Sequence, residues 1–238
     1  MDGFSYSDIF ATKGIEYLII ITFLVLLVPF WMILDKQVEL KSKIQKALGF
    51  LSAGILNIPQ GLFYSKNHTW MFMEKSGTAK VGLDDLLLHI TGVVKFNHLK
   101  TPGEMISKGD LLTEIDQDGK LLRILSPVSG KIIAANVSIS EIPGILNDDP
   151  YGKGWIYKIK PSNWIAEVKS CYFAEDATIW SSDELERFKD FLAVSMKNHS
   201  PEPSMVILQD GGELCDHSLS TLPNEIWRDF EAEFLNLN

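Results

Sequence analysis

The pattern of apolar and polar positions near the start of the chain differs from the pattern in the rest of it. Near the start, one unbroken apolar run, YLIIITFLVLLVPFWMIL from Tyr17 to Leu34, contains no charged side chain. A helix over this run, at about 1.5 Å per residue, has roughly the length of a bilayer's hydrocarbon core. The preceding residues 1–16 lack the basic region of a cleaved signal peptide. The pattern therefore predicts a retained transmembrane helix at 17–34, with a buried core helix as the alternative.

Lysines on either side of this run predict its orientation. Lys36, Lys41, Lys43 and Lys46 follow the run, whereas only Lys13 precedes it. The positive-inside rule then places the N-terminus outside and the main domain in the cytoplasm, as in a single-pass protein of the inner, cytoplasmic membrane. Residues 39–56, within the segment 35–57, have apolar positions at helical spacing. They predict a juxtamembrane helix or linker, lying on the membrane or simply connecting.

From Trp70 onward the pattern changes to short β-rich runs separated by Gly and Pro. One helical interruption, DDLLLHI, occupies residues 84–90. Several short strands at regular spacing predict a mainly β domain, a small barrel or sandwich. The predicted strands are WMFME, TAKVGL, GVVKFNHL, DLLTEIDQ, LLRIL, GKIIAANV and GWIYKIK.

Composition narrows the classes of function. The chain has 238 residues, a formal net charge of −9 and 2 cysteines. The acidic balance argues against a nucleic-acid partner. Cys215 and His217 form a C-x-H pair without a second pair nearby, so no metal site is predicted. We find no catalytic triad, phosphate loop or paired-carboxylate motif, and predict that the protein is not an enzyme.

Several segments resemble one protein family when they are taken together in order. They are IPQGLFYSKNHTW, TAKVGLDD, TPGEMISKGD, SPVSGKI and NDDPYGKGWIYKIKPSN. Residues 58–193 resemble the H protein of the glycine cleavage system. The resemblance implies a barrel-sandwich hybrid fold related to lipoyl and biotinyl domains. It also implies a carrier whose lysine, at the tip of a hairpin, holds lipoate while the protein itself catalyses nothing.

The hairpin DQDGKLLRIL departs from the family pattern. The family's lysine stands seven residues before the serine of SPVSG, and that position is Gly119 here, so Lys120 is one place late. Asp118-Gly119 is a strong two-residue turn signal, and a shift of one residue in a strand re-aims the side chain. Lys120 is the candidate for lipoyl attachment, and the other interpretation is a solvated lysine beside a tight turn. We expect no cofactor, with lipoate as the alternative.

Residues 194–238 extend beyond the family resemblance. KNHSPEPS indicates a linker, MVILQDGGEL a strand with a Gly-Gly turn, and TLPNEIWRDFEAEFL an amphipathic helix. We therefore expect a short α/β extension. Its apolar stripe could pack on the domain itself or dock to another protein, and the sequence leaves both open. The stripe consists of Ile226, Trp227, Phe230, Phe234 and Leu235.

Two functions follow from these features. The first is a membrane-anchored, H-protein-like subunit or assembly factor of a membrane-associated, possibly redox, complex, which is not lipoylated and binds the bilayer and protein partners. The second is a lipoyl carrier with lipoate on Lys120. A tether would suit the carrier too, because it raises the effective concentration of the arm near one partner.

Overall fold

A computed structural model describes residues 14, 16–31, 50–199, 208–209 and 213–235. The chain divides into two compact units, Met1–Leu48 and Gly49–Asn238. Each unit is described by itself below.

The helix in the N-terminal unit corrects the predicted topology. Residues 16–31 are helical with exposed side chains. Across the described residues, no helix combines the length and the apolar character that a membrane crossing requires. The prediction of a transmembrane helix at 17–34 in a single-pass inner-membrane protein is therefore wrong. Residues 32–34, and 35–49 of the expected juxtamembrane helix, lie outside the described residues.

The second unit is built on two antiparallel sheets, and each predicted run contains a strand. The three-stranded sheet has the order β5 (Lys95–His98), β7 (Leu111–Gln117) and β8 (Lys120–Leu125). Alternate side chains of both sheets point into a common apolar core. The seven-stranded sheet has the order β11 (Tyr172–Phe173), β2 (Phe63–Tyr64), β3 (Thr69–Met73), β4 (Ala79–Leu83), β10 (Trp155–Pro161), β9 (Gly130–Ala135) and β6 (Met105–Ile106).

Helix α2 (Asp85–Thr91) confirms the predicted helical interruption. Its N-cap is Asp84, whose Oδ1 accepts a hydrogen bond from the Leu87 amide at 2.9 Å. Asp84 Oδ2 lies 2.8 Å from Nδ1 of the buried His68, so one carboxylate joins the helix start to the turn before β3. The shorter helices are α3 (Ser138–Glu141), α4 (Ile145–Asp148), α5 (Trp164–Glu167) and η1 (Val168–Ser170).

Helix α6 (Glu175–His199) is longer than the sequence predicts at both ends. The resemblance to the H protein implies a final helix at SSDELERFKDFLA, residues 181–193, and the pattern from Lys197 onward predicts a linker. Leu185, Phe188, Leu192 and Met196 are buried at helical spacing, so the core-facing side continues past that end. Burial of this face carries the helix through the residues expected to form the linker.

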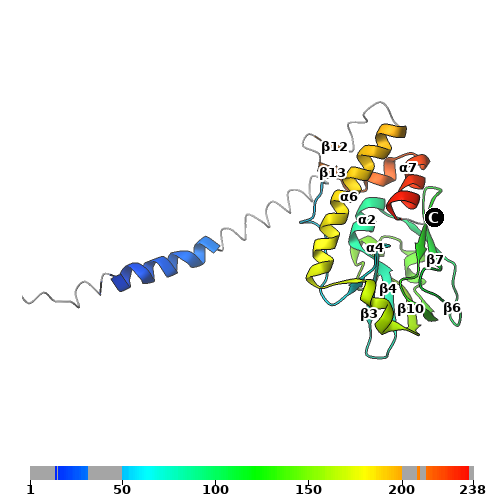
Figure 1. The fold of residues 1–238 in the computed structure, drawn as a ribbon, viewed down its shortest axis with the longest axis horizontal. Helices are drawn as coiled ribbons and strands as arrows, with labels where there is room; N and C mark the ends of the chain where they lie inside the picture. The colour runs from blue at the N-terminus through cyan, green and yellow to red at the C-terminus, as the bar shows by residue number, and fades with distance from the viewer. Residues whose placement is uncertain (1–13, 15, 32–49, 200–207, 210–212, 236–238) are drawn as a thin grey trace, which may run out of the picture. The chain divides into compact units, whose positions relative to one another are not determined.

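The C-terminal extension, described at 208–209 and 213–235, packs on the domain rather than projecting from it. β12 (Leu208–Gln209) and β13 (Glu213–Cys215) form a small sheet with β1 (Phe50–Leu51). The chain continues through η2 (Ser218–Thr221), α7 (Asn224–Asp229) and the π-helical turn η3 (Phe230–Phe234). In Figure 1, α6 in yellow to orange and α7 in orange-red lie side by side.

An aromatic cluster fixes this packing and decides between the two interpretations of the apolar stripe. Phe230 and Phe234 stack at 5.0 Å, and both meet Phe188 of α6 edge-on. All five residues of the stripe are at most 3% exposed. The stripe is therefore core of its own domain, and it is not available as a docking face.

Candidate functional site: the hairpin end under the C-terminal extension

The β7–β8 hairpin closes with the predicted Asp-Gly turn. Gln117 pairs with Lys120, leaving Asp118 and Gly119 as the two turn residues. Their φ angles are 52° and 86°, and two positive values in succession define the mirror-image turn that matches strand twist. The Gly119 amide donates to Asp116 Oδ1 at 2.7 Å, which further stabilises the turn.

The register places Lys120 on the inner face of β8. Successive side chains of a strand point to opposite faces, and Leu122 and Ile124, which share a face with Lys120, are buried. Leu121 and Arg123 lie on the other face and are exposed. The Lys120 side chain therefore points toward the covered side of the hairpin.

The Lys120 ammonium group is held by the extension. Its Nζ donates to the carbonyl oxygen of Ser220 at 2.9 Å and to that of Leu222 at 2.7 Å. These carbonyls belong to the last turn of η2 and the residue that follows it, where backbone oxygens lack partners within the helix. Lys120 Nζ also lies 5.6 Å from the centre of the Trp227 ring, a cation–π distance.

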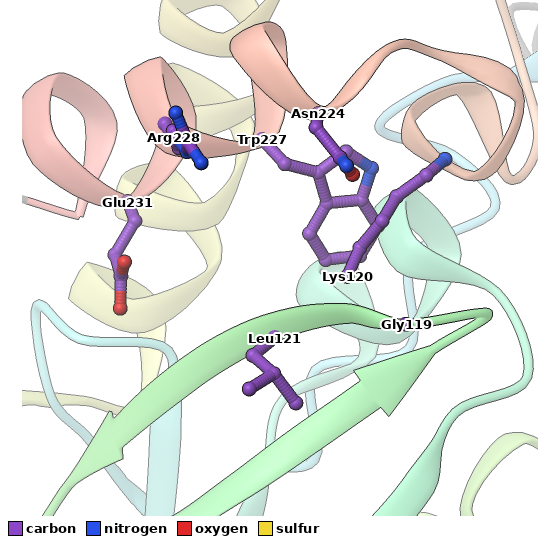
Figure 2. A pocket seen from close by; sticks show the side chains of 7 residues that line it. All are labelled: Gly119, Lys120, Leu121, Asn224, Trp227, Arg228 and Glu231. Carbon is purple, nitrogen blue, oxygen red and sulfur yellow. The ribbon is translucent and has the colours of Figure 1, made fainter.

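A cavity of about 250 Å³ lies between the hairpin end and α7. Figure 2 shows α7 above the strand, with Lys120 extending beside the Trp227 ring. Beyond the cavity, Glu231 Oε1 accepts from the Arg123 amide at 3.1 Å and from Arg123 Nε at 2.7 Å, which covers part of the outer edge of β8. The lining residues are Gly119, Lys120, Leu121, Asn224, Trp227, Arg228 and Glu231.

This geometry bears on the chemistry of the lysine. A lipoyl amide carries no charge and has one N–H, whereas the Lys120 ammonium group donates to two carbonyl oxygens. Acylation at this nitrogen would remove at least one of these hydrogen bonds together with the cation–π contact. As arranged, the residues around Lys120 fit an ammonium group and do not fit an acylated one.

His68 and His89 make contacts that stabilise the fold. His68 stacks on Phe234 of the extension at 5.7 Å, and its bond to Asp84 supports the fold. His89 of α2 lies 2.8 Å from Asp216 Oδ1, which links the domain to the extension. Burial lowers the pKa of His89, but bonds to Asp216 and Asp85 outweigh burial and raise it to about 9. Within the described residues, no cluster of ligand side chains suited to a metal ion occurs.

The two sheets, the hairpin and the flanking helices define a mainly β, lipoyl-type domain with C-terminal helices. A family model described as "Glycine cleavage H-protein" matches residues 62–183, about half of the chain. The chain belongs to the glycine cleavage H-protein family. The match ends inside α6, and the segments that hold Lys120 follow it.

Two relatives agree with this assignment. A probable glycine cleavage system H protein of Pyrococcus horikoshii is 36% identical over 52% of this chain and 92% of its own length. The glycine cleavage system H protein of Psychrobacter cryohalolentis is 33% identical, over 50% of this chain and 94% of its own. A crystal structure of the H protein from Mycobacterium marinum aligns with a TM-score of 0.41 and 27% identity, covering 44% of this chain and 87% of that chain.

Sequence reasoning singled out Lys120 but missed what this lysine contacts. Ser220 and Leu222 bind Lys120 through backbone oxygens, which no side-chain pattern reveals. Trp227 was noted only as part of the apolar stripe. An amphipathic stripe on the extension and a lysine on the inner face of a hairpin were both visible signals, but nothing in the sequence paired them.

Proposed function

We propose that this H-protein family member is a non-catalytic protein that works through contacts with other proteins, as a subunit or assembly factor of a protein complex, and that Lys120 carries no lipoate. The observation behind this proposal is the Lys120 ammonium group, bonded to the Ser220 and Leu222 carbonyls of the chain's own extension. A lipoyl arm needs an amine that the attaching enzyme can reach. Here the amine stabilises the end of η2 instead.

Family membership favours a second candidate, a lipoyl carrier that uses Lys120. Its amine is next to the hairpin turn, and the relatives are named as glycine cleavage system H proteins. For this candidate the segment around Ser220 would have to leave the hairpin before attachment. Trp227, at 3% exposed, and Leu222, at 5%, oppose such a displacement because both are packed in the core.

Intact mass of the protein purified from its own host separates the two candidates. We expect the unmodified mass, and an unmodified peptide across Leu111 to Lys131. Lipoate found on Lys120 would overturn the proposal. Lysines Lys108 and Lys131 lie near the same hairpin in sequence and are exposed, so the peptide map must assign any modification to a single residue.

A lipoate-attaching enzyme of broad specificity gives the matched control. The double variant Gly119→Lys, Lys120→Met puts an amine at the family's position. Nothing lies within 4 Å of a Cβ built on Gly119, although its φ of +86° makes a side chain there strained by about 1 kcal/mol. We expect the double variant to accept lipoate in vitro and the wild-type chain to accept none. Lipoylation of the wild-type chain at Lys120 would favour the carrier.

The interaction role has its own test. The tagged chain expressed in its host should elute in a complex larger than its own 26.8 kDa. Lys120→Met should leave that complex intact, because the proposed role does not use the amine as a carrier. Elution as a monomer would contradict the proposal.

A further inference from the structure

A second cavity, of about 320 Å³, is lined by none of the hairpin residues. Its walls come from Tyr172 of β11 and from Asp176, Ile179, Trp180 and Asp183 of α6. The four α6 residues recur at three- and four-residue spacing, so they form one stripe along the helix. The cavity is therefore a groove along the first turns of α6, and the proposed role of Lys120 does not involve it.

An aromatic pair forms the wall of this groove. Tyr172 and Trp180 stack with their ring centres 4.8 Å apart and their planes at 10°. Trp180 is 6% exposed and also packs against His68, so the pair is anchored in the domain. Ile179 beside it is 55% exposed and leaves an apolar lip open to solvent. Because Trp180 is nearly buried, the half-buried Tyr172 ring and the Ile179 side chain are the parts of this wall that a flat group or an aliphatic stem can reach.

Two carboxylates flank this wall. Asp176 and Asp183 are exposed, and neither has a hydrogen bond or ion pair with another residue in the described part of the chain. Asp176 and Asp183 are seven residues apart, which on a helix is about 10 Å along the axis. A cation midway between the two carboxylates would therefore lie roughly 5 Å along the axis from each of them. Asp176 stands in the first turn of α6, where the helix dipole favours an acid. Asp183, two turns further on, has no such role.

We propose that this groove, whose residues are Tyr172, Asp176, Ile179, Trp180 and Asp183, binds an arginine side chain of a partner protein. A guanidinium group is planar and always charged, stacks on aromatic rings and presents several donors to carboxylates. Its aliphatic stem would lie on Ile179. The inference rests on the proposed function only in that the protein acts by binding other proteins. The groove would serve that role whether or not Lys120 is modified.

Titration of the full chain with a blocked Gly-Arg-Gly tripeptide tests the site. The indole N–H resonance of Trp180 is followed by NMR, and it is identified among the six tryptophans as the one absent in Trp180→Phe. We expect a saturable shift with the arginine peptide. The isosteric citrulline peptide should bind about tenfold more weakly, because it lacks the charge that pairs with two partly exposed carboxylates.

Variants of the carboxylates complete the test. Asp176→Asn with Asp183→Asn should weaken the arginine peptide about tenfold, whereas Asp190→Asn, an exposed aspartate of α6 outside the groove, should leave its affinity unchanged. An unmoved Trp180 resonance, or equal affinity for arginine and citrulline, would overturn the site. A lysine peptide that binds as tightly would overturn the assignment to arginine. Lipoate on Lys120 would contradict the proposed function without changing this titration.

Discussion

The family domain and the C-terminal extension reach similar burial by different means. The domain is held by ladders of backbone hydrogen bonds across two antiparallel sheets. The described end of the extension, residues 213–235, has only one short strand, β13, and inserts apolar side chains instead. Leu219, Ile226 and Phe230 are fully buried, as are the central strand residues Val81 and Ile159.

Several polar contacts join the two regions. His89 meets Asp216, Lys120 meets the carbonyls of Ser220 and Leu222, and Arg123 meets Glu231. Lys120 and Arg123 both belong to strand β8. At the end of the extension, Arg187 of α6 donates to the Phe234 carbonyl oxygen at 3.0 Å, and Asn67 Nδ2 donates to that of Leu235 at 3.4 Å. The difference teaches that apolar burial holds the extension on the domain, whereas its polar groups determine where it lies, over the end of the β7–β8 hairpin.

Removing an aromatic anchor should produce the largest effect. Phe230→Ala deletes a fully buried ring that packs on Phe188 and Phe234. We expect the free energy of unfolding to fall by about 3–5 kcal/mol, the usual cost of such a cavity. Denaturant unfolding measures it. Phe72→Ala, on β3 at 43% exposed, is the control and should lose far less. Equal losses would mean that the extension contributes little to the core.

Loss of the Lys120 amine should have the next largest effect. Lys120→Met keeps the stem but leaves the carbonyls of Ser220 and Leu222 without their charged donor. We expect a loss of about 2–3 kcal/mol in unfolding free energy. Lys131→Met changes an exposed lysine of β9 and should stay within about 0.5 kcal/mol. If both variants unfold alike, Lys120 is not a link between the two regions.

The sequence predicts the domain well because its signals are local. Each β-rich run contains a strand, Asp84 caps α2, and Asp118-Gly119 forms the hairpin turn. These features depend on neighbouring residues, whose period and turn preferences can be read directly. The direction of the Lys120 side chain also follows from the alternation of side chains along β8.

The sequence could not predict the N-terminal helix correctly, nor the features that depend on non-local contacts. The run from Tyr17 to Leu34 was interpreted from hydropathy alone as a membrane span, which no described helix supports. The Lys120 contacts join positions about a hundred residues apart, and both hydrogen-bond acceptors are backbone oxygens. Helix α6 continues past residue 193 because Met196 is buried in the core.

The His89–Asp216 link predicts a pH dependence. The pKa of His89 is raised to about 9 from its ordinary 6.5. The folded state therefore holds this proton more tightly than the unfolded state, so the stabilisation is complete below about pH 6.5 and is lost as pH rises through about 9. We expect a loss on the order of 2 kcal/mol across this window, discounted for the part of the imidazole that water reaches.

Denaturant unfolding at pH 6.5 and at pH 9.5 measures this dependence. Lysines and tyrosines begin to titrate near the upper end, so the comparison is with His89→Gln. This variant keeps a polar side chain but cannot take up the proton, and it should show the smaller loss. Identical pH profiles would remove His89 from the links between the two regions.

The Arg123–Glu231 pair should have the smallest effect. The Arg123 side chain is 46% exposed and that of Glu231 is 20% exposed, so water screens the attraction. Glu231→Gln retains an oxygen that can accept from the Arg123 amide but loses the charge. We expect about 0.5 kcal/mol at low salt and less at high salt, whereas Glu233→Gln, an exposed neighbour, should change nothing. A loss approaching that of Lys120→Met would mean that the outer edge of β8, rather than the inward-facing lysine, fixes the position of the extension.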